Sequence, residues 1–442
     1  MDAMDQPVAS PEPGAGGTGS WDRGPASAPE PAHRARAARG GQAPEGVGPT
    51  GMGERPLGRS RHRALYNRRI QRADERWPLV TRLSTWLFSR PELVLGALGV
   101  RQSVEVDGRV LNRSTQALVE LAHRWPAASD KMRDDPVAMR ARLTRLARSA
   151  MPIRTDVHVT GRVLRPAGVP SRIPIRIYRQ FGTGIGSGGW GSRPPAIVNF
   201  HGGGFVVGDL DSHDSSCRLL AAVSGCIVVS VAYRLAPENP FPAAVDDALA
   251  AYAWVQRHSD EVGHHEGRVG VMGDSAGGNL AAVVARQTRD GSASGAPDVP
   301  PPVAQGLIYP ALDARLQSAS ARSMADRFLL TVDDMEYFRA CYLPDRSQWD
   351  TARVSPLLAD DHGDLAPALV VTAGFDPLRD DGARYAELLE KAGVEVEYRC
   401  YDDQVHGFMT MGILPDSLAL ATEVCDAMGR LMRRTPPSGM PE

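Results

Sequence analysis

The chain contains 442 residues, of which 42% are hydrophobic and 23% are charged, and its formal net charge is -2. This composition is typical of a globular protein with a large core, and nothing in it favours a nucleic-acid partner. The sequence has no C-x-x-C pair and no apolar run of about 18 residues, so we expect neither a metal site nor a membrane-spanning helix. The start of the chain lacks a signal-peptide pattern, which predicts a cytoplasmic location. The five cysteines are scattered: Cys217, Cys226, Cys341, Cys400 and Cys425.

Residues 1–62 and residues 63–151 differ in composition. The first 60 residues include 12 glycines and 9 prolines and almost no large apolar side chains, so we expect a disordered tail over 1–62. Between 63 and 151, apolar residues recur at helical spacing, most clearly from Trp77 to Phe88. Such helices need an apolar surface to pack on, which predicts a helical layer, or cap, on a larger domain. An amphipathic segment at a membrane surface, around Trp77 to Phe88, is the alternative interpretation.

From residue 152 to about 435, short β-branched runs alternate with helical patterns. The predicted strands are 156–164, 173–178, 196–200, 226–232, 268–272, 304–309, 368–373 and 394–401. The predicted helices are 212–223, 243–258, 278–289, 381–392 and 416–433. This alternation predicts a mostly parallel eight-stranded sheet with helices on both faces, whose ligands bind outside the carboxyl ends of the strands. Residues 313–350 fit the pattern less well, and we expect them to form an insertion over that end.

The predicted strand 268–272 and the predicted helix 278–289 are joined by the sequence Gly-Asp-Ser-Ala-Gly, with Ser275 at its centre. A sharp turn from strand to helix exposes the serine hydroxyl at the sheet edge, and the flanking glycines allow neighbouring backbone to approach closely. The same five-residue pattern also occurs by chance in loops. Its position between a strand and a helix predicts that Ser275 is a nucleophile.

Ser275 needs a base and an oriented acid, because an unassisted hydroxyl is almost fully protonated at neutral pH. His406 follows the last predicted strand, and Asp376 follows the strand before it. A parallel sheet delivers both side chains to the edge that carries Ser275. The sequence therefore predicts His406 as the base and Asp376 as the acid.

Four other carboxylates lie near Asp376 or His406 in the sequence: Asp380, Asp381, Asp402 and Asp403. We expect the first two in the first turn of the helix that follows, where the helix dipole stabilises their charges. The last two are alternatives to Asp376 as the acid, although a solvated loop is the simpler interpretation of that pair.

The sequence His-Gly-Gly-Gly, from His201 to Gly204, follows the predicted strand 196–200 at the same sheet edge. Successive glycines let the backbone pass close to a bound ester and point N–H groups at a developing oxyanion. A flexible turn is the alternative interpretation. The serine motif downstream favours an oxyanion site.

Six motifs together resemble the hormone-sensitive-lipase-like branch of the α/β-hydrolases, in the order typical of that family. They are HGGGF at 201–205, YRLAPE at 233–238, FPAA at 241–244, GDSAGGN at 273–279, DPLRD at 376–380 and HGF at 406–408. The resemblance extends from about residue 155 to 430. It implies an α/β-hydrolase fold with a helical cap, built from the N-terminal helices and the insertion.

The same resemblance implies cofactor-free hydrolysis of carboxylic esters, often with a preference for short to medium acyl chains. It implies Ser275 as nucleophile, His406 as base and Asp376 as acid. The implied oxyanion donors are the N–H groups of Gly203, Gly204 and Ala276. The expected partner is a small-molecule or lipid ester.

Three other functions use the same fold or the same residues. One is a protein that binds a small molecule without turning it over, although this chain lacks none of the expected triad residues. A second is an amidase or deacetylase, and a third is a lipase in peripheral contact with a membrane. The sequence does not fix the natural substrate or the oligomeric state.

Overall fold

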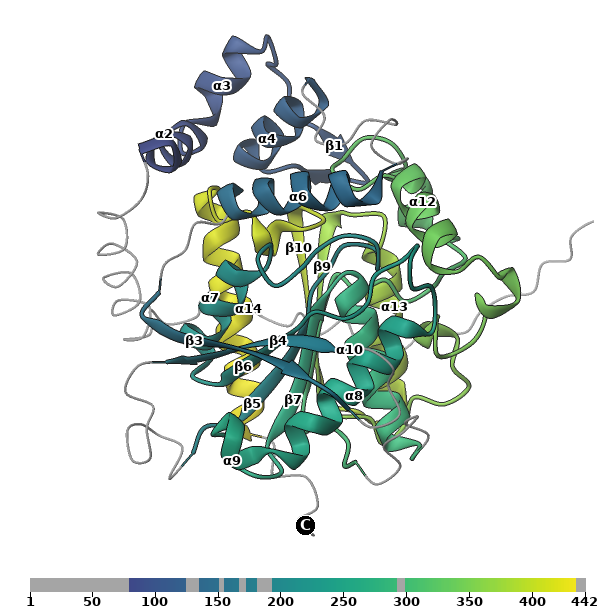
Figure 1. The fold of residues 1–442 in the computed structure, drawn as a ribbon. Helices are drawn as coiled ribbons and strands as arrows, with labels where there is room; N and C mark the ends of the chain where they lie inside the picture. The colour runs from purple at the N-terminus through teal and green to yellow at the C-terminus, as the bar shows by residue number, and fades with distance from the viewer. Residues whose placement is uncertain are drawn as a thin grey trace, which may run out of the picture. The chain divides into compact units, whose positions relative to one another are not determined.

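The computed structural model describes residues 79–124, 135–150, 155–166, 172–180, 193–291 and 299–434. These residues form a central sheet with helices on both faces and a further group of helices at one end (Figure 1). The tail predicted over residues 1–62 lies outside the described residues.

The central sheet has eight strands in the order β10-β9-β8-β7-β5-β6-β4-β3. Its strands are β3 (Val157–Leu164), β4 (Ile173–Gln180), β5 (Ala196–Phe200), β6 (Ile227–Val231), β7 (Val269–Asp274), β8 (Gln305–Ile308), β9 (Ala368–Phe375) and β10 (Val396–Val405). Neighbouring strands are parallel except at β4, which is antiparallel to both β3 and β6. The mostly parallel eight-stranded sheet confirms the predicted fold class.

The central strands are buried on both faces, which explains why they appear in the sequence as continuous apolar runs. Every residue of β5, β6 and β9 is buried. One apolar core joins one face of the sheet to α8 (Ala243–Arg257), α10 (Ala276–Arg289) and α13 (Arg379–Lys391). A second core joins the opposite face to α7 (Asp214–Ser224) and α14 (Pro415–Arg434). The short helix α9 (Ser259–Val262) precedes β7.

The chain before the sheet forms a separate group of elements. They are α2 (Leu79–Phe88), α3 (Pro91–Ala97), a ribbon of β1 (Glu105–Val106) and β2 (Arg109–Val110), α4 (Arg113–Arg124) and α6 (Pro136–Ala150). Figure 1 shows this group at one end of the sheet, with α6 lying across that end. The ribbon was not predicted, although Asp107 and Gly108, with φ of +54° and +73°, are a strong two-residue hairpin signal.

The segment 313–350 forms α11 (Ala319–Ser323), α12 (Val332–Tyr342) and a 3-10 turn at Arg346–Gln348. The start of α12 is fixed by a capping box, because the Thr331 hydroxyl accepts the N–H of Asp334 and the Asp334 carboxylate accepts the N–H of Thr331. Two more 3-10 turns, Pro356–Leu358 and Phe408–Thr410, lie near the same end of the sheet.

Candidate active site

Ser275 occupies the sharp turn between β7 and α10. Its φ of +56° and ψ of -119° are strained for a residue with a Cβ. The turn is held on both sides, because the Ser275 N–H donates to the Ile308 carbonyl at 2.9 Å and the Ser275 carbonyl accepts from the Asn279 N–H at 3.1 Å. A Cβ at Gly277 would overlap the carbonyl oxygen of Phe200. Strand β5 therefore packs directly against the turn and fixes the position of the serine hydroxyl.

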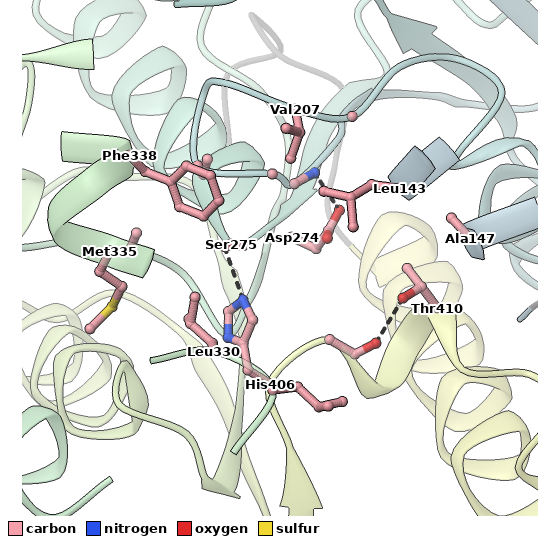
Figure 2. A pocket seen from close by; sticks show the side chains of 18 of the residues that line it. Leu143, Ala147, Val207, Asp274, Ser275, Leu330, Met335, Phe338, His406 and Thr410 are labelled. Carbon is pink, nitrogen blue, oxygen red and sulfur yellow. Dashed lines mark hydrogen bonds between the residues drawn. The ribbon is translucent and has the colours of Figure 1, made fainter. Parts of the chain in front are cut away.

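The residues predicted as nucleophile, base and acid lie in one hydrogen-bonded row. The Ser275 Oγ lies 3.0 Å from Nε2 of His406, and Nδ1 of His406 lies 2.8 Å from Oδ2 of Asp376. Figure 2 shows the His406 ring turned toward Ser275. Asp376 is fully buried, and its Oδ1 accepts the N–H of Leu378 at 2.8 Å. Because each carboxylate oxygen has its own donor, the orientation of Asp376 is fixed.

Asp402 and Asp403, the alternative acids, form their hydrogen bonds elsewhere. Asp402 is exposed and pairs with Arg109 of β2 at 2.7 Å. The Asp403 carboxylate accepts from the side-chain amide of Asn112 at 3.5 Å, and the Asp403 carbonyl accepts the Asn112 N–H at 3.0 Å. Both residues therefore anchor the N-terminal elements to β10.

Asp380 and Asp381 lie in the first turn of α13, as the sequence predicts. Asp380 accepts the N–H of Ser320 at 2.7 Å. Asp381 departs from the expectation of a charge stabilised by the helix dipole. Burial, and after it the neighbouring Asp313 carboxylate, raise the pKa of Asp381 to about 8. Asp381 is therefore mostly protonated at neutral pH.

The loop after β5 brings the predicted oxyanion donors to the site. Gly203 and Gly204 have φ of +120° and +58°, where a side chain would be strained. The Gly203 carbonyl accepts the N–H of Val206 at 3.0 Å, which closes the loop into a tight turn. Among the hydrogen bonds of the described residues, none is donated by the N–H of Gly203, Gly204 or Ala276. These three residues line the same cavity as Ser275.

This cavity has a volume of about 770 Å³. Its lining includes Ser275, His406, the glycine loop and apolar side chains from α4, α6 and the segment that contains α12. Figure 2 shows Leu143, Val207, Leu330, Met335 and Phe338 around Ser275 and His406. A Cβ at Gly204 would overlap the Phe338 ring, so α12 packs directly on the glycine loop. The N-terminal helices and the insertion therefore both contribute to the cavity wall.

Arg140 of α6 ties the N-terminal helices to the sheet. Its guanidinium donates to the carbonyls of Val206 at 2.7 Å and Ala236 at 2.8 Å, and it forms two hydrogen bonds with the Glu238 carboxylate at 2.9 and 2.6 Å. The sequence interpretation missed Arg140, because arginines are abundant in this chain. The available signal was Glu238, the last residue of the YRLAPE motif, whose carboxylate needs a cationic partner.

The described residues contain neither a metal-binding cluster nor a membrane-spanning helix. No group of three or more histidine, cysteine or acidic side chains there could hold a metal ion. No described helix combines the length and the apolar character needed to cross a membrane.

Comparison with known proteins agrees with this fold. A family model described as alpha/beta hydrolase fold matches residues 197–410. The carboxylic ester hydrolase LipN of Mycobacterium tuberculosis is 39% identical over 376 residues, which cover 84% of this chain and 95% of that protein. The carboxylesterase NlhH of Mycobacterium tuberculosis is 43% identical over 231 residues, which cover 52% of this chain and 70% of that protein.

A solved structure gives the same result. The ester hydrolase EH1AB1 from the metagenome of Lake Arreo, in complex with a bipyridine phosphonate derivative, superposes with a TM-score of 0.66 at 36% identity. The match covers 72% of this chain and 98% of that one. The fold is therefore that of an α/β-hydrolase enzyme. Within this class, the chain belongs to the hormone-sensitive-lipase-like branch, as its six motifs predicted, and it is a hydrolase of the carboxylesterase type.

Proposed function

We propose that the chain hydrolyses carboxylic esters with short to medium acyl groups through an acyl-enzyme on Ser275. The observation that carries this proposal is the row of hydrogen bonds from Ser275 through His406 to Asp376 beside an apolar cavity. In this assignment Ser275 is the nucleophile, His406 is the general base, and the buried Asp376 holds the imidazole in its working orientation.

The reaction begins when Nε2 of His406 takes the hydroxyl proton of Ser275 while Oγ adds to the carbonyl carbon of the ester. The Asp376 carboxylate stabilises the imidazolium that forms. The imidazolium then gives its proton to the leaving alcohol, and the acyl group remains on Ser275. A water molecule activated by the same imidazole hydrolyses the acyl-enzyme and restores the free serine.

We assign the stabilisation of the developing oxyanion to the N–H groups of Gly203, Gly204 and Ala276. These N–H groups donate no other hydrogen bond among the described residues, so they can donate to a ligand oxygen. Ala276 is also the first residue of α10, where the helix dipole favours negative charge. Donors that are oriented before the reaction stabilise the transition state more than the bound ester.

The N-terminal helices and the segment around α12 are assigned as the cap. Supporting observations are that α4, α6 and α12 all line the cavity and that Arg140 fastens α6 to the glycine loop. A cavity of about 770 Å³ has to hold both the acyl and the alcohol parts of the substrate. We expect the acyl part to be of short to medium length, as the resemblance of the six motifs to the family implies.

The test is hydrolysis of p-nitrophenyl esters from acetate to palmitate by the wild type and by Ser275→Ala. We expect the wild type to prefer the shorter esters and the variant to lose at least about a thousandfold in kcat, because the nucleophile is gone. A serine-directed phosphonate should label the wild type once and leave the variant unlabelled. Turnover by correctly folded Ser275→Ala at a tenth of the wild-type rate would refute the mechanism.

A second candidate function is hydrolysis of esters presented at a lipid surface. It is favoured by large exposed apolar side chains on α2 and α3, namely Leu83 at 58%, Trp86 at 47% and Leu93 at 56% exposure. The Arg90 guanidinium lies 4.6 Å from the centre of the Trp86 ring. Amphipathic helices that bind the membrane interface carry both arginine and tryptophan.

The two candidates differ in how the rate depends on the physical state of the substrate. A lipid-surface enzyme should accelerate when tributyrin passes its solubility limit, and Leu83→Ser with Trp86→Ser should abolish that rise. The double variant should hydrolyse dissolved p-nitrophenyl butyrate as the wild type does. A smooth saturation curve through the solubility limit would exclude the lipid-surface function.

A further inference from the structure

A second histidine, His213, lies beside the nucleophile and takes no part in the reaction described above. It directly precedes α7 and is largely buried, and its Nε2 lies 3.4 Å from each carboxylate oxygen of Asp274. Asp274 is the residue before Ser275, and its Oδ1 accepts the N–H of Gly202 at 3.0 Å. A single carboxylate therefore joins His213 to the first glycine of the loop that carries the proposed oxyanion donors.

The hydrogen bonds around His213 favour a doubly protonated ring. Oγ of Ser212 lies 2.9 Å from Nδ1 of His213, accepts the N–H of Asp209 at 2.9 Å, and donates to the Asp209 carbonyl at 2.9 Å. A hydroxyl has only one hydrogen to donate, so when Ser212 gives it to the Asp209 carbonyl, Nδ1 supplies the hydrogen for its contact with Ser212. On the other side of the ring, Nε2 faces a carboxylate and must also donate. Both ring nitrogens are donors, which makes the ring an imidazolium.

The charges around the ring are consistent with an imidazolium. Burial alone lowers the pKa of His213, but the charge and hydrogen bond of Asp274, together with the charge of Asp209, raise it above its ordinary value. His201 is the other nearby histidine, with its ring centre 5.5 Å away. Burial, and after it the charge of His213, lower the pKa of His201 to about 4, so His201 is neutral. His406 also interacts electrostatically with Asp274.

The same network reaches the cavity wall. Oδ1 of Asp209 accepts the N–H groups of Asp211 at 3.0 Å and Ser212 at 2.6 Å. Its Oδ2 accepts the hydroxyl of Thr144, on α6, at 2.9 Å. Thr144 lines the cavity. A continuous set of polar contacts therefore connects a cap helix to the glycine loop.

We propose that His213 is a positioning residue. Its imidazolium holds Asp274 against the Gly202 amide and so keeps the glycine loop in its position relative to Ser275. The inference rests on the proposed function, because it concerns the donors of that reaction's oxyanion. A neutral ring has one N–H and cannot serve both Asp274 and Ser212. Loss of the proton should therefore loosen the loop and lower kcat, while the substrate, which is held mainly by apolar walls, should bind with a similar KM.

The first test is the pH profile of kcat for hydrolysis of p-nitrophenyl butyrate by the full-length wild type and His213→Gln. The wild type should lose activity at alkaline pH as the imidazolium of raised pKa is deprotonated. Glutamine offers a donor to Asp274 but has no titrating charge, so the variant should lose this alkaline decline. Its kcat should fall at least about tenfold, less than the 10²–10³-fold that removal of an oxyanion donor costs, because the donors remain present. His158→Gln, which alters an exposed histidine on β3, is the matched control and should behave as the wild type.

The second test keeps the ring and changes only its partner. Ser212→Ala removes the acceptor of the Nδ1 hydrogen, so the midpoint of the alkaline decline should move down by about half a pH unit or more, with the acidic side of the profile unchanged. A purely structural role for Ser212 would lower the Tm and leave that midpoint in place. This variant also decides the question if His213→Gln does not fold.

The outcomes separate the two proposals. A wild type that hydrolyses no ester would refute the proposed function. If the wild type hydrolyses esters, two results would overturn only the role of His213. One is a folded His213→Gln variant with the wild-type kcat, and the other is a Ser212→Ala variant whose alkaline decline has the wild-type midpoint.

Discussion

Asparagine at position 376 would reverse the hydrogen bonding of His406, the proposed general base. Oδ1 of Asp376 accepts the N–H of Leu378 at 2.8 Å, and an asparagine would keep its carbonyl oxygen there, because its amide hydrogens would repel that donor. Its NH₂ group would then occupy the position 2.8 Å from Nδ1 of His406. Nδ1 would become the acceptor and the ring hydrogen would move to Nε2, which could no longer take the proton of Ser275.

The expected loss follows from this tautomer. The corresponding change in a serine protease costs about 10⁴ in kcat, which at about 1.4 kcal/mol per factor of ten is about 5 kcal/mol of transition-state stabilisation. KM should change little, because Asp376 is fully buried behind the imidazole and does not contact substrate. The assay is steady-state hydrolysis of p-nitrophenyl butyrate at neutral pH, with the Tm as the control for folding.

The matched control is Asp402→Asn. This exposed carboxylate pairs with Arg109 rather than with His406, and an exposed ion pair contributes about 0–1 kcal/mol, so kcat should be unchanged. An Asp376→Asn enzyme within tenfold of the wild-type kcat would refute the reasoning. So would an Asp402→Asn enzyme as slow as Asp376→Asn.

Three further predictions follow from the cap and from the buried carboxyl group. Arg140→Met should lower the unfolding free energy by about 3 kcal/mol, measured by urea denaturation, because it loses charged hydrogen bonds. Glu238→Gln keeps both hydrogen bonds from Arg140 to backbone carbonyls and should cost less. Equal costs would contradict the role of Arg140 in holding α6 to the glycine loop. Because the folded pKa of Asp381 lies near 8, above the unfolded value of about 3.9, wild-type stability should fall as the pH rises between these values. The Tm advantage of Asp381→Asn should therefore grow from pH 5 to pH 9, and a constant difference would argue against a protonated Asp381. Phe338→Ala should shift the preferred p-nitrophenyl ester to a longer acyl chain, and an unchanged profile would show that this ring does not limit the cavity.

The sheet could be predicted from the sequence because its central strands are buried on both faces. A strand such as Ile227–Val231 needs no partner to be recognised, since every residue of it is apolar or small and buried. Ser275, Asp376 and His406 could be proposed as one site for a related reason. Each follows a recognisable strand, and parallel strands deliver the residues after them to one edge.

The contacts of the proposed cap could not be predicted in the same way. Arg140 reaches a carbonyl 66 residues away, and His213 reaches a carboxylate 61 residues away. Neither spacing leaves a periodic pattern, and both depend on how the loops after β5 and β6 fold over the sheet edge. The prediction that Asp381 carries a charge was wrong for a similar reason. The burial that raises its pKa comes from tertiary packing and not from its position in the helix.

The N-terminal helices that line the cavity are synthesised early, but some of their packing partners lie near the end of the chain. Arg109 pairs with Asp402 across 293 residues, and Thr115 bonds to Gln404 across 289 residues. A ribosome therefore releases α4 long before β10 exists, and Val119 of this helix, which packs with Phe375 and Val405, lacks these partners during that time. Contacts of such long sequence separation slow folding and leave aggregation-prone intermediates exposed. We expect refolding yield to fall as protein concentration rises, and ester hydrolysis to recover later than the far-ultraviolet circular dichroism signal of the sheet and its helices.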